Sequence, residues 1–116
     1  MCLFCQIAAA AIPVTRLYED DLTLAFPDIN PQAPIHILII PKRHIPSLTD
    51  TVPADATLLG HLLATAAEVA RQQNLGIRQN GGGYRLVLNT GPDGGQTVDH
   101  LHLHLLGGRH MTWPPG

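Results

Sequence analysis

DHLHLHLLGG, residues 99–108, places a histidine at every second position of an apolar stretch. Side chains alternate between the two faces of a strand, so His100, His102 and His104 share one face and the leucines share the other. The leucine face predicts burial in a core, under a helix from elsewhere in the chain. The histidine face predicts a surface or a cleft. The stretch therefore predicts a strand over 98–106 with one apolar face and one face of imidazoles.

The rest of the chain predicts four more strands and one long helix. Leucines and alanines recur at helical spacing over 54–76, and Gly76 is placed to end that helix. The strands follow one another with little helix between them, which favours an antiparallel sheet in one α+β domain over residues 1–116. A short helix is expected at the N-terminus. The four expected strands are 16–20, 22–26, 35–41 and 83–89, of which 35–41 is apolar on both faces like a central strand.

The composition limits the classes of partner. The 116 residues carry a formal net charge of −2, which excludes a broad basic face, and we expect no nucleic-acid partner. No apolar run is long enough to span a bilayer, and the N-terminus lacks the basic residues of a signal peptide. Cys2 and Cys5 lie too close together to form the framework of a secreted domain. We therefore expect a cytoplasmic protein with no membrane partner.

Three histidines on one face leave few interpretations. His100 and His104 are roughly 13 Å apart along a strand, too far for one metal ion with bonds of about 2 Å to bind all three. A solvated polar face would include threonine, lysine or glutamate, and none is present. A neutral imidazole whose Nδ1 is held as a donor is a nucleophile near pH 7, so His102 between two helpers suits attack on phosphorus. His36 and His61 are interpreted as structural.

The segment CLFC, residues 2–5, has Cys-x-x-Cys spacing, and three interpretations stay open. A redox pair needs a strand before it, and only Met1 precedes Cys2. A zinc site needs two more ligands, for which His44 and His100 are candidates. In the third interpretation the two cysteines are reduced, buried and inert.

The sequence resembles the histidine triad (HIT) superfamily over nearly its whole length. HLHLHLL fits the His-φ-His-φ-His-φ-φ pattern of that superfamily, and GGRHMTWPPG resembles the tail of its HINT branch, the nucleoside phosphoramidate hydrolases. The other similar segments are FCQI, AFPDINPQAPIHILIIPKRH, LLGHLL and YRLVLNTGPDGGQTVDH. The resemblance implies a HIT-like fold, a five-stranded antiparallel sheet with one long and one short helix. It also implies a homodimer whose sheets join into a continuous ten-stranded sheet, with the tail 111–116 reaching the partner's site.

The resemblance implies an activity, the hydrolysis of purine nucleoside 5′-phosphoramidates of the AMP-amine or AMP-lysine type. His102 attacks the α-phosphorus, the amine leaves, and water releases the monophosphate from a nucleotidyl-histidine. His104 contacts the phosphate and assists the leaving group, while the main-chain carbonyl of His100 orients His102. Two alternatives are a dinucleoside polyphosphate hydrolase, which typically lacks the WPPG tail, and a non-catalytic nucleotide-binding or scaffold protein.

The resemblance also implies a substrate pocket and a metal site. The glycine-rich loop 90–97 can turn backbone N–H groups toward a phosphate, and Asp28 can accept both ribose hydroxyls. The resemblance supports a structural zinc ion, with no cofactor needed for the chemistry itself. The implied zinc ligands are Cys2, Cys5, His44 and His100. The implied substrate contacts are Leu3, Phe4, Ile7, Phe26, Asp28, Ile29, Asn89, Gly95, Gln96, Thr97, His102 and His104.

Overall fold

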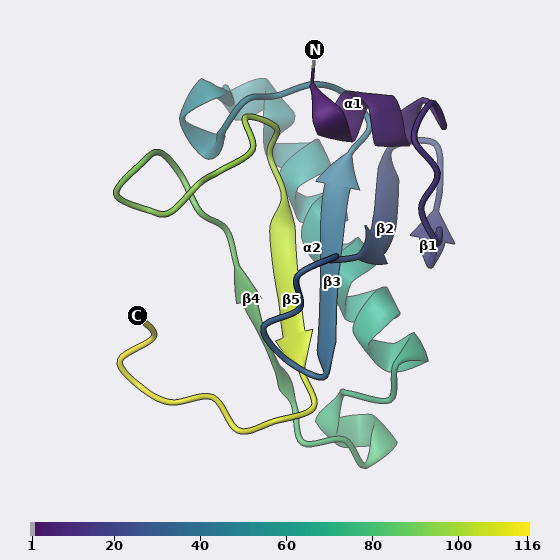
Figure 1. The fold of residues 1–116 in the computed structure, drawn as a ribbon, viewed down its shortest axis with the longest axis vertical. Helices are drawn as coiled ribbons and strands as arrows, with labels where there is room; N and C mark the ends of the chain where they lie inside the picture. The colour runs from purple at the N-terminus through teal and green to yellow at the C-terminus, as the bar shows by residue number, and fades with distance from the viewer. Residues whose placement is uncertain (1) are drawn as a thin grey trace.

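The computed structural model describes residues 2–116 and contains a five-stranded antiparallel sheet with the strand order β1-β2-β3-β5-β4 (Figure 1). The central strand β3 is buried from its second residue to its last, as its two apolar faces predict. The predicted five-stranded antiparallel sheet is confirmed. The strands are β1 (Tyr18–Glu19), β2 (Thr23–Pro27), β3 (Ile35–Pro41), β4 (Tyr84–Val87) and β5 (Leu103–Gly107).

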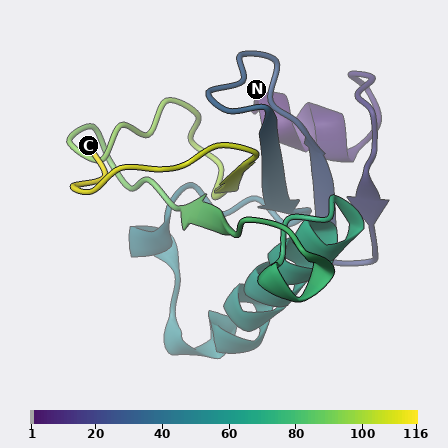
Figure 2. The same ribbon diagram turned by 90° about the horizontal axis from the view of Figure 1, so that it is seen from below.

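The helices cover opposite faces of this sheet (Figure 2). The long helix α2 (Ala56–Gln72) packs on one face against β2, β3 and β5, and the short helix α1 (Leu3–Ala8) lies on the other. Each helix buries its own apolar cluster, so the molecule has two cores separated by the sheet. Within residues 2–116 no helix is both long and apolar enough to cross a membrane. Short 3-10 turns lie at η1 (Leu48–Asp50), η2 (Pro53–Asp55) and η3 (Ile77–Gln79).

The long helix is shorter than the predicted range 54–76. Its start is preceded by the 3-10 turn η2, and its last helical residue is Gln72. Asn74, with φ of +56°, makes the reversal that was assigned to Gly76, whose φ of −66° is ordinary. Asparagine tolerates the left-handed region better than most residues, which explains why the prediction of Gly76 as the terminator is wrong.

The last strand begins at Leu103, five residues later than the predicted 98, because the residues before it are bound elsewhere. Leu101 N–H donates to the carbonyl of Ile45 (2.6 Å), and His100 Nε2–H donates to that of Pro41 (2.8 Å). Alternation nevertheless continues from this segment into β5, since Leu101, Leu103 and Leu105 all join the α2-side core. The predicted strand 35–41 has the observed bounds of β3. The observed β1 and β4 are shorter at both ends than the predicted 16–20 and 83–89, and β2 is shifted by one residue from the predicted 22–26.

Candidate active site

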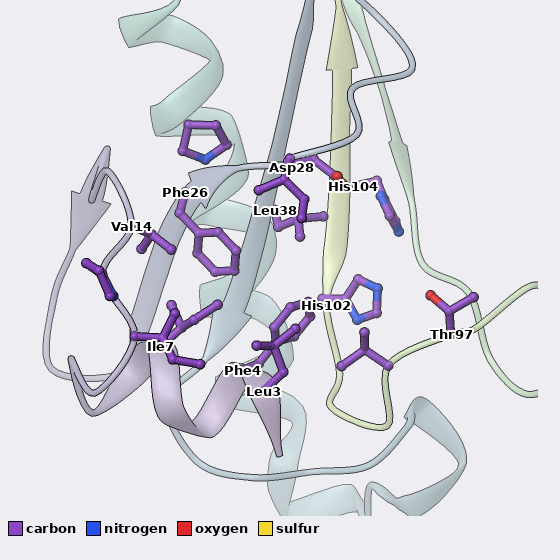
Figure 3. Close-up of a pocket in the computed structure, with 15 residues that line it drawn as sticks. Leu3, Phe4, Ile7, Val14, Phe26, Asp28, Leu38, Thr97, His102 and His104 are labelled. Atoms are coloured by element: carbon purple, nitrogen blue, oxygen red, sulfur yellow. The ribbon is translucent and has the colours of Figure 1, made fainter. Parts of the chain in front are cut away.

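A cavity of about 350 Å³ opens on the face of the sheet that carries α1 (Figure 3). One end is apolar, where Phe26 and Ile7 lie, and the other end carries the imidazoles of His102 and His104 near the hydroxyl of Thr97. Among the substrate contacts expected from the sequence, the structure brings together Leu3, Phe4, Ile7, Phe26, Asp28, Ile29, Thr97, His102 and His104 around this cavity.

Three of the expected substrate contacts do not line the cavity: Asn89, Gly95 and Gln96. Asn89 lies two residues beyond the end of β4. Gly95 has a φ of +81°, a conformation that favours glycine, and so shapes the loop backbone. The Gln96 side chain donates to the carbonyl of Pro46 (2.7 Å) and thereby ties the loop to a distant segment. Gly95 and Gln96 therefore support the loop that carries Thr97 to the cavity.

His102 is held with one nitrogen free toward the cavity. Its Nδ1 lies 2.7 Å from the main-chain oxygen of His100, and since a carbonyl can only accept, Nδ1 carries the proton. Nε2 of the neutral ring therefore keeps its lone pair. Phe4 packs edge-on against the imidazole, with ring centroids 5.1 Å apart, and the residue is 5% exposed. The ring is buried and oriented, with the unprotonated nitrogen available to a substrate.

A fourth histidine, His36, contacts this site, although the sequence alone led us to interpret it as structural. The backbone N–H of Gln32 donates to its Nδ1 (3.0 Å), so the proton of the neutral ring is on Nε2. That Nε2–H lies 2.8 Å from His104 Nδ1 and donates to it. His104 must then carry its own proton on Nε2. A chain of two hydrogen bonds thus makes His104 a neutral donor.

Burial keeps these two imidazoles neutral. It lowers the pKa of His36, and only the nearby carboxylate of Asp28 opposes that change. Burial and the neighbouring imidazoles of His102 and His36 lower the pKa of His104 to about 4. At neutral pH His104 can therefore offer an N–H without a positive charge.

The signal that could have placed His36 in the site lies in the pairing of β3 with β5. Leu38 pairs directly with His104, and His36 is two residues away on the same strand. Diagonal neighbours on one sheet face are within reach of each other's side chains. Sequence alone did not give this register, so the contact could not be predicted.

The four expected zinc ligands come together beside the cavity. Cys2 Sγ lies 3.3 Å from His100 Nδ1, and Cys5 Sγ lies 3.2 Å from His44 Nδ1. The two Nδ1 atoms are 3.3 Å apart, and Cys5 Sγ is 3.6 Å from His100 Nδ1. A tetrahedral zinc ion with bonds of about 2.0 to 2.3 Å gives ligand–ligand distances of about 3.3 to 3.8 Å. The residues therefore fit a Cys₂His₂ site.

The protonation of His100 supports this fit. Its Nε2–H donates to the carbonyl of Pro41, which leaves the lone pair of Nδ1 directed at the cluster. Burial and the adjacent Cys2 raise the pKa of the Cys5 thiol, so a thiolate at Cys5 needs a cation to stabilise it. His100 is fully buried and thus contributes its side chain to the cluster and its carbonyl to His102.

A second group, Asp28, His36 and His104, also converges, but its hydrogen bonds exclude a metal. Metal binding at His36 Nε2 would require the proton on Nδ1, where the N–H of Gln32 already donates. The 2.8 Å contact between the two imidazoles is a hydrogen bond instead.

Comparison with known proteins places this geometry in a family. Residues 9–111 match the model of the HIT domain. The chain belongs to the HIT family. Cys2 and Cys5 precede the matched range, so the family match does not extend to the cysteine pair.

Several relatives of this HIT domain cover almost the same length. An uncharacterised HIT-like protein of Synechocystis sp. is 55% identical over 114 residues, which are 98% of this chain and 96% of that protein. The crystal structure of a HIT family hydrolase from Legionella pneumophila Philadelphia 1 is 52% identical with a TM-score of 0.93, over the whole of both chains. A histidine triad nucleotide-binding protein from Candida albicans is 34% identical with a TM-score of 0.81, over 98% of this chain and 83% of that chain.

Proposed function

We propose that this HIT domain is a hydrolase of purine nucleoside 5′-phosphoramidates that works through a covalent nucleotidyl-histidine on His102. The observation that carries the proposal is the 2.7 Å hydrogen bond from His102 Nδ1 to the carbonyl of His100, which leaves Nε2 bare at the cavity. Solved relatives described as a HIT family hydrolase and a histidine triad nucleotide-binding protein support the reaction class and the ligand class.

The first chemical step is a displacement at phosphorus. The Nε2 lone pair of His102 forms a bond to the α-phosphorus, and the bond from phosphorus to the amine nitrogen breaks. The electron pair of that bond goes to the leaving nitrogen, which takes a proton from solvent. In the second step a water oxygen attacks phosphorus, the bond to Nε2 breaks, and the nucleoside monophosphate leaves. Its surplus proton returns to solvent, and His102 is restored.

His104 stabilises the charge on the phosphoryl group during both steps. It lies beside His102, with ring centroids 5.0 Å apart, and its Nε2–H is left free by the hydrogen bond at Nδ1. A fixed donor directed at a developing negative charge lowers the barrier because it needs no reorganisation. Thr97 at the same end of the cavity supplies a hydroxyl for another phosphoryl oxygen.

The apolar end of the cavity fits a nucleoside. Phe4 and Phe26 meet edge to face, with centroids 5.6 Å apart, and form a wall on which a base can pack. Ile29, 99% exposed, stands at the rim. One oxygen of Asp28 accepts the N–H of Asn30 (2.8 Å), and an ionised carboxylate keeps further acceptor sites for ribose hydroxyls.

We also propose a structural zinc ion and a homodimer. Cys2, Cys5, His44 and His100 would hold the zinc, which would fix the position of the His100 backbone and take no part in the chemistry. The dimer is supported by the sheet order, since β4 lies at one edge and can pair with a second copy. Tyr84 on that strand is exposed. Joining two such edges gives a continuous ten-stranded sheet.

The test compares the wild-type protein with His102→Ala and with the control His61→Ala, whose imidazole lies on α2 away from the cavity. Wild type and the control are expected to release AMP from an adenosine 5′-phosphoramidate and to show a nucleotidyl adduct by mass spectrometry. His102→Ala should show neither. Wild-type turnover of diadenosine polyphosphates but not of phosphoramidates would favour the first alternative. AMP binding with no turnover of either would favour the scaffold alternative.

A further inference from the structure

The short helix α1 needs support from outside itself. It has six residues, and isolated helices of fewer than about 12 are marginal in water. The last carbonyls of any helix have no partner within it, and α1 has no basic residue in its last turn to satisfy them. Backbone N–H groups of residues 9–12 bond the carbonyls of Cys5, Gln6 and Ile7, but no backbone N–H of the described residues reaches that of Ala8, so the end of the helix needs a further donor.

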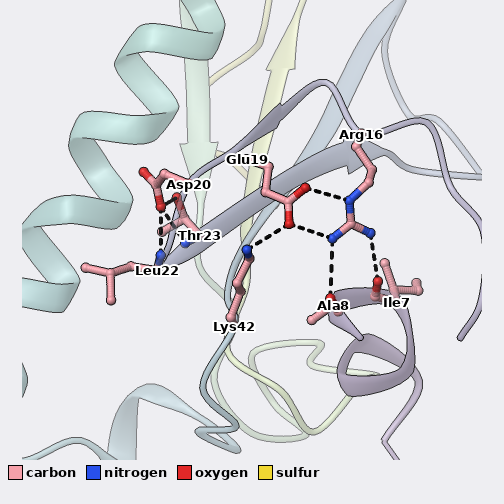
Figure 4. Close-up of polar contacts among 8 residues, drawn as sticks. All are labelled: Ile7, Ala8, Arg16, Glu19, Asp20, Leu22, Thr23 and Lys42. Carbon is pink, nitrogen blue, oxygen red and sulfur yellow. Dashed lines mark hydrogen bonds and ion pairs between the residues drawn. The ribbon is translucent and has the colours of Figure 1, made fainter. Parts of the chain in front are cut away.

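Arg16 supplies that support from the segment before β1 (Figure 4). Its Nη1 donates to the carbonyl of Ile7 (2.9 Å), and its Nη2 donates to that of Ala8 (3.3 Å). These are the last two residues of α1, where the helix dipole places partial negative charge. One guanidinium group therefore binds both final carbonyls.

The guanidinium is itself held by a second layer of charges. Glu19 on β1 accepts from Arg16 Nε and Nη2, both at 2.9 Å, and Lys42 Nζ lies 2.7 Å from the Glu19 carboxylate (Figure 4). The two cations hold the pKa of Glu19 at about 2, so the carboxylate stays ionised at neutral pH. Lys42 directly follows the end of β3. We name Arg16, Glu19 and Lys42 the clasp, since they connect α1 to two strands.

What the clasp holds is one wall of the cavity. Phe4 and Ile7 of α1 are buried, and both line the apolar end. Phe4 also packs edge-on against Phe26 and against the His102 ring. A small movement of α1 would widen the apolar end and loosen the packing behind the imidazole.

We propose that Arg16 is a positioning residue of the nucleotide pocket, which anchors the end of α1 and thereby fixes the wall formed by Phe4 and Ile7. The inference rests on the proposed function for the identity of the ligand, and on the contacts alone for the role of the clasp. The clasp side chains are partly exposed, with Arg16 27% and Glu19 39% accessible. Exposed ion pairs add little to global stability. The effect of Arg16 should therefore be local.

The experiment compares Arg16→Met and Arg16→Lys with the control Arg71→Met. Arg71 also pairs with a glutamate three residues away, Glu68 at 2.9 Å, but on the outer surface of α2. Hydrogen exchange by mass spectrometry should report the amides of Ala9, Ala10 and Ala11, which close the end of α1. We expect Arg16→Met to speed their exchange by roughly tenfold, with strands β3 and β5 unchanged. The exchange rate in Arg16→Lys should lie between those of the wild type and Arg16→Met. A lysine keeps the positive charge but lacks the planar guanidinium, which donates to several acceptors at once.

The second measurement is the affinity for AMP by calorimetry, with kcat and KM on an adenosine phosphoramidate. Arg16→Met should raise the Kd for AMP and the KM by roughly fivefold to tenfold and change kcat by less than about twofold. Glu19→Gln should show a smaller effect of the same kind, and Arg71→Met none. If Arg16→Met does not fold, the lysine and glutamine variants carry the same comparison.

These measurements distinguish a failure of the proposed role of Arg16 from a failure of the proposed hydrolase function. Exchange at Ala9 to Ala11 equal to that of Arg71→Met would overturn the clasp, whatever the activity. Faster exchange with unchanged AMP affinity would overturn the link from the clasp to the pocket. A wild-type protein that binds AMP but hydrolyses no phosphoramidate would remove the proposed reaction, and the exchange and affinity data would still decide the role of Arg16.

Discussion

Replacing His36 with phenylalanine tests whether the proton arrangement of the site matters for catalysis. The change keeps a buried aromatic ring in β3 and removes the N–H that lies 2.8 Å from His104 Nδ1. His104 is then free to move its proton to Nδ1. In that tautomer its Nε2 presents a lone pair, which repels a phosphoryl oxygen where the wild-type ring donates.

The magnitude follows from what the lost hydrogen bond is worth. Complete loss of a donor to a developing charge costs about 10² to 10³ in rate. In His36→Phe the Nε2–H donor of His104 is lost only in the fraction of molecules that adopt the other tautomer. That fraction is set by the lost hydrogen bond from His36, which is worth about 0.5–1.5 kcal/mol. That range corresponds to a factor of about 2 to 13, so we expect kcat to fall by up to about tenfold at pH 7.5. The free energy of unfolding should fall by about 0.5–1.5 kcal/mol, since His104 Nδ1 and the backbone N–H of Gln32, which are only partly buried, lose their partner.

We also expect the ratio of variant to wild-type kcat to change with pH. Burial and the imidazole of His102 are the larger causes that hold the pKa of His104 at about 4, and His36 is a smaller one, so removing His36 raises that pKa by only part of the way to its ordinary value. As the pH falls, the His104 ring of the variant therefore gains a proton at a higher pH than the wild-type ring does, and both of its nitrogens then become donors. The ratio of variant to wild-type kcat should therefore rise as the pH falls from 7.5 to 5.5.

The assay is steady-state hydrolysis of an adenosine phosphoramidate across that pH range, with His61→Phe as the control imidazole outside the site. His36→Gln, whose amide can present an N–H near the same position, should recover part of the rate. A His36→Phe variant with the wild-type kcat and a constant ratio at every pH would refute the proposed tautomer chain.

Two further predictions concern stability and metal. The pKa of His104 is about 4 in the folded chain and 6.5 in the unfolded one, so the unfolded chain binds more protons between these two values. The free energy of unfolding should therefore decrease as the pH is lowered through this range. Urea titrations at pH 6.5 and 5 should show a loss of about 1 kcal/mol that His104→Gln lacks, because solvent screens this partly buried ring and reduces the full value of the pKa shift. Equal losses in both proteins would contradict this origin. Native mass spectrometry should find about one zinc ion per chain, lost when Cys2 and Cys5 are both changed to serine, because the site needs four ligands. Equal zinc content in both proteins would exclude the cysteines as ligands.

Patterns with a short repeat allowed much of this molecule to be predicted. The apolar run at 35–41 identified the central strand with its observed bounds. The alternation of histidine and leucine over 100–105 separated imidazoles from core leucines, even though the ladder of β5 begins only at Leu103. Both depend on the period of a strand, which is a local property of the chain.

The ends of elements were predicted less well, because they depend on contacts made elsewhere. The bonds of Leu101 to Ile45 and of His100 to Pro41 delay the start of β5. Likewise Asn74, and not Gly76, takes the left-handed conformation after α2. In each case a neighbour distant in sequence, or a residue with a weaker intrinsic preference, sets the boundary.

The sequence by itself determined the alternating faces, the central strand and the family to which the chain belongs. Only the tertiary structure decided that His36 donates to His104 and that Arg16 binds the end of α1. It also brought together Cys2, Cys5, His44 and His100, which the sequence offered only as candidates. The physical reason is that periodicity specifies which side of an element a residue faces. Strand register and the paths of the loops specify what it meets there.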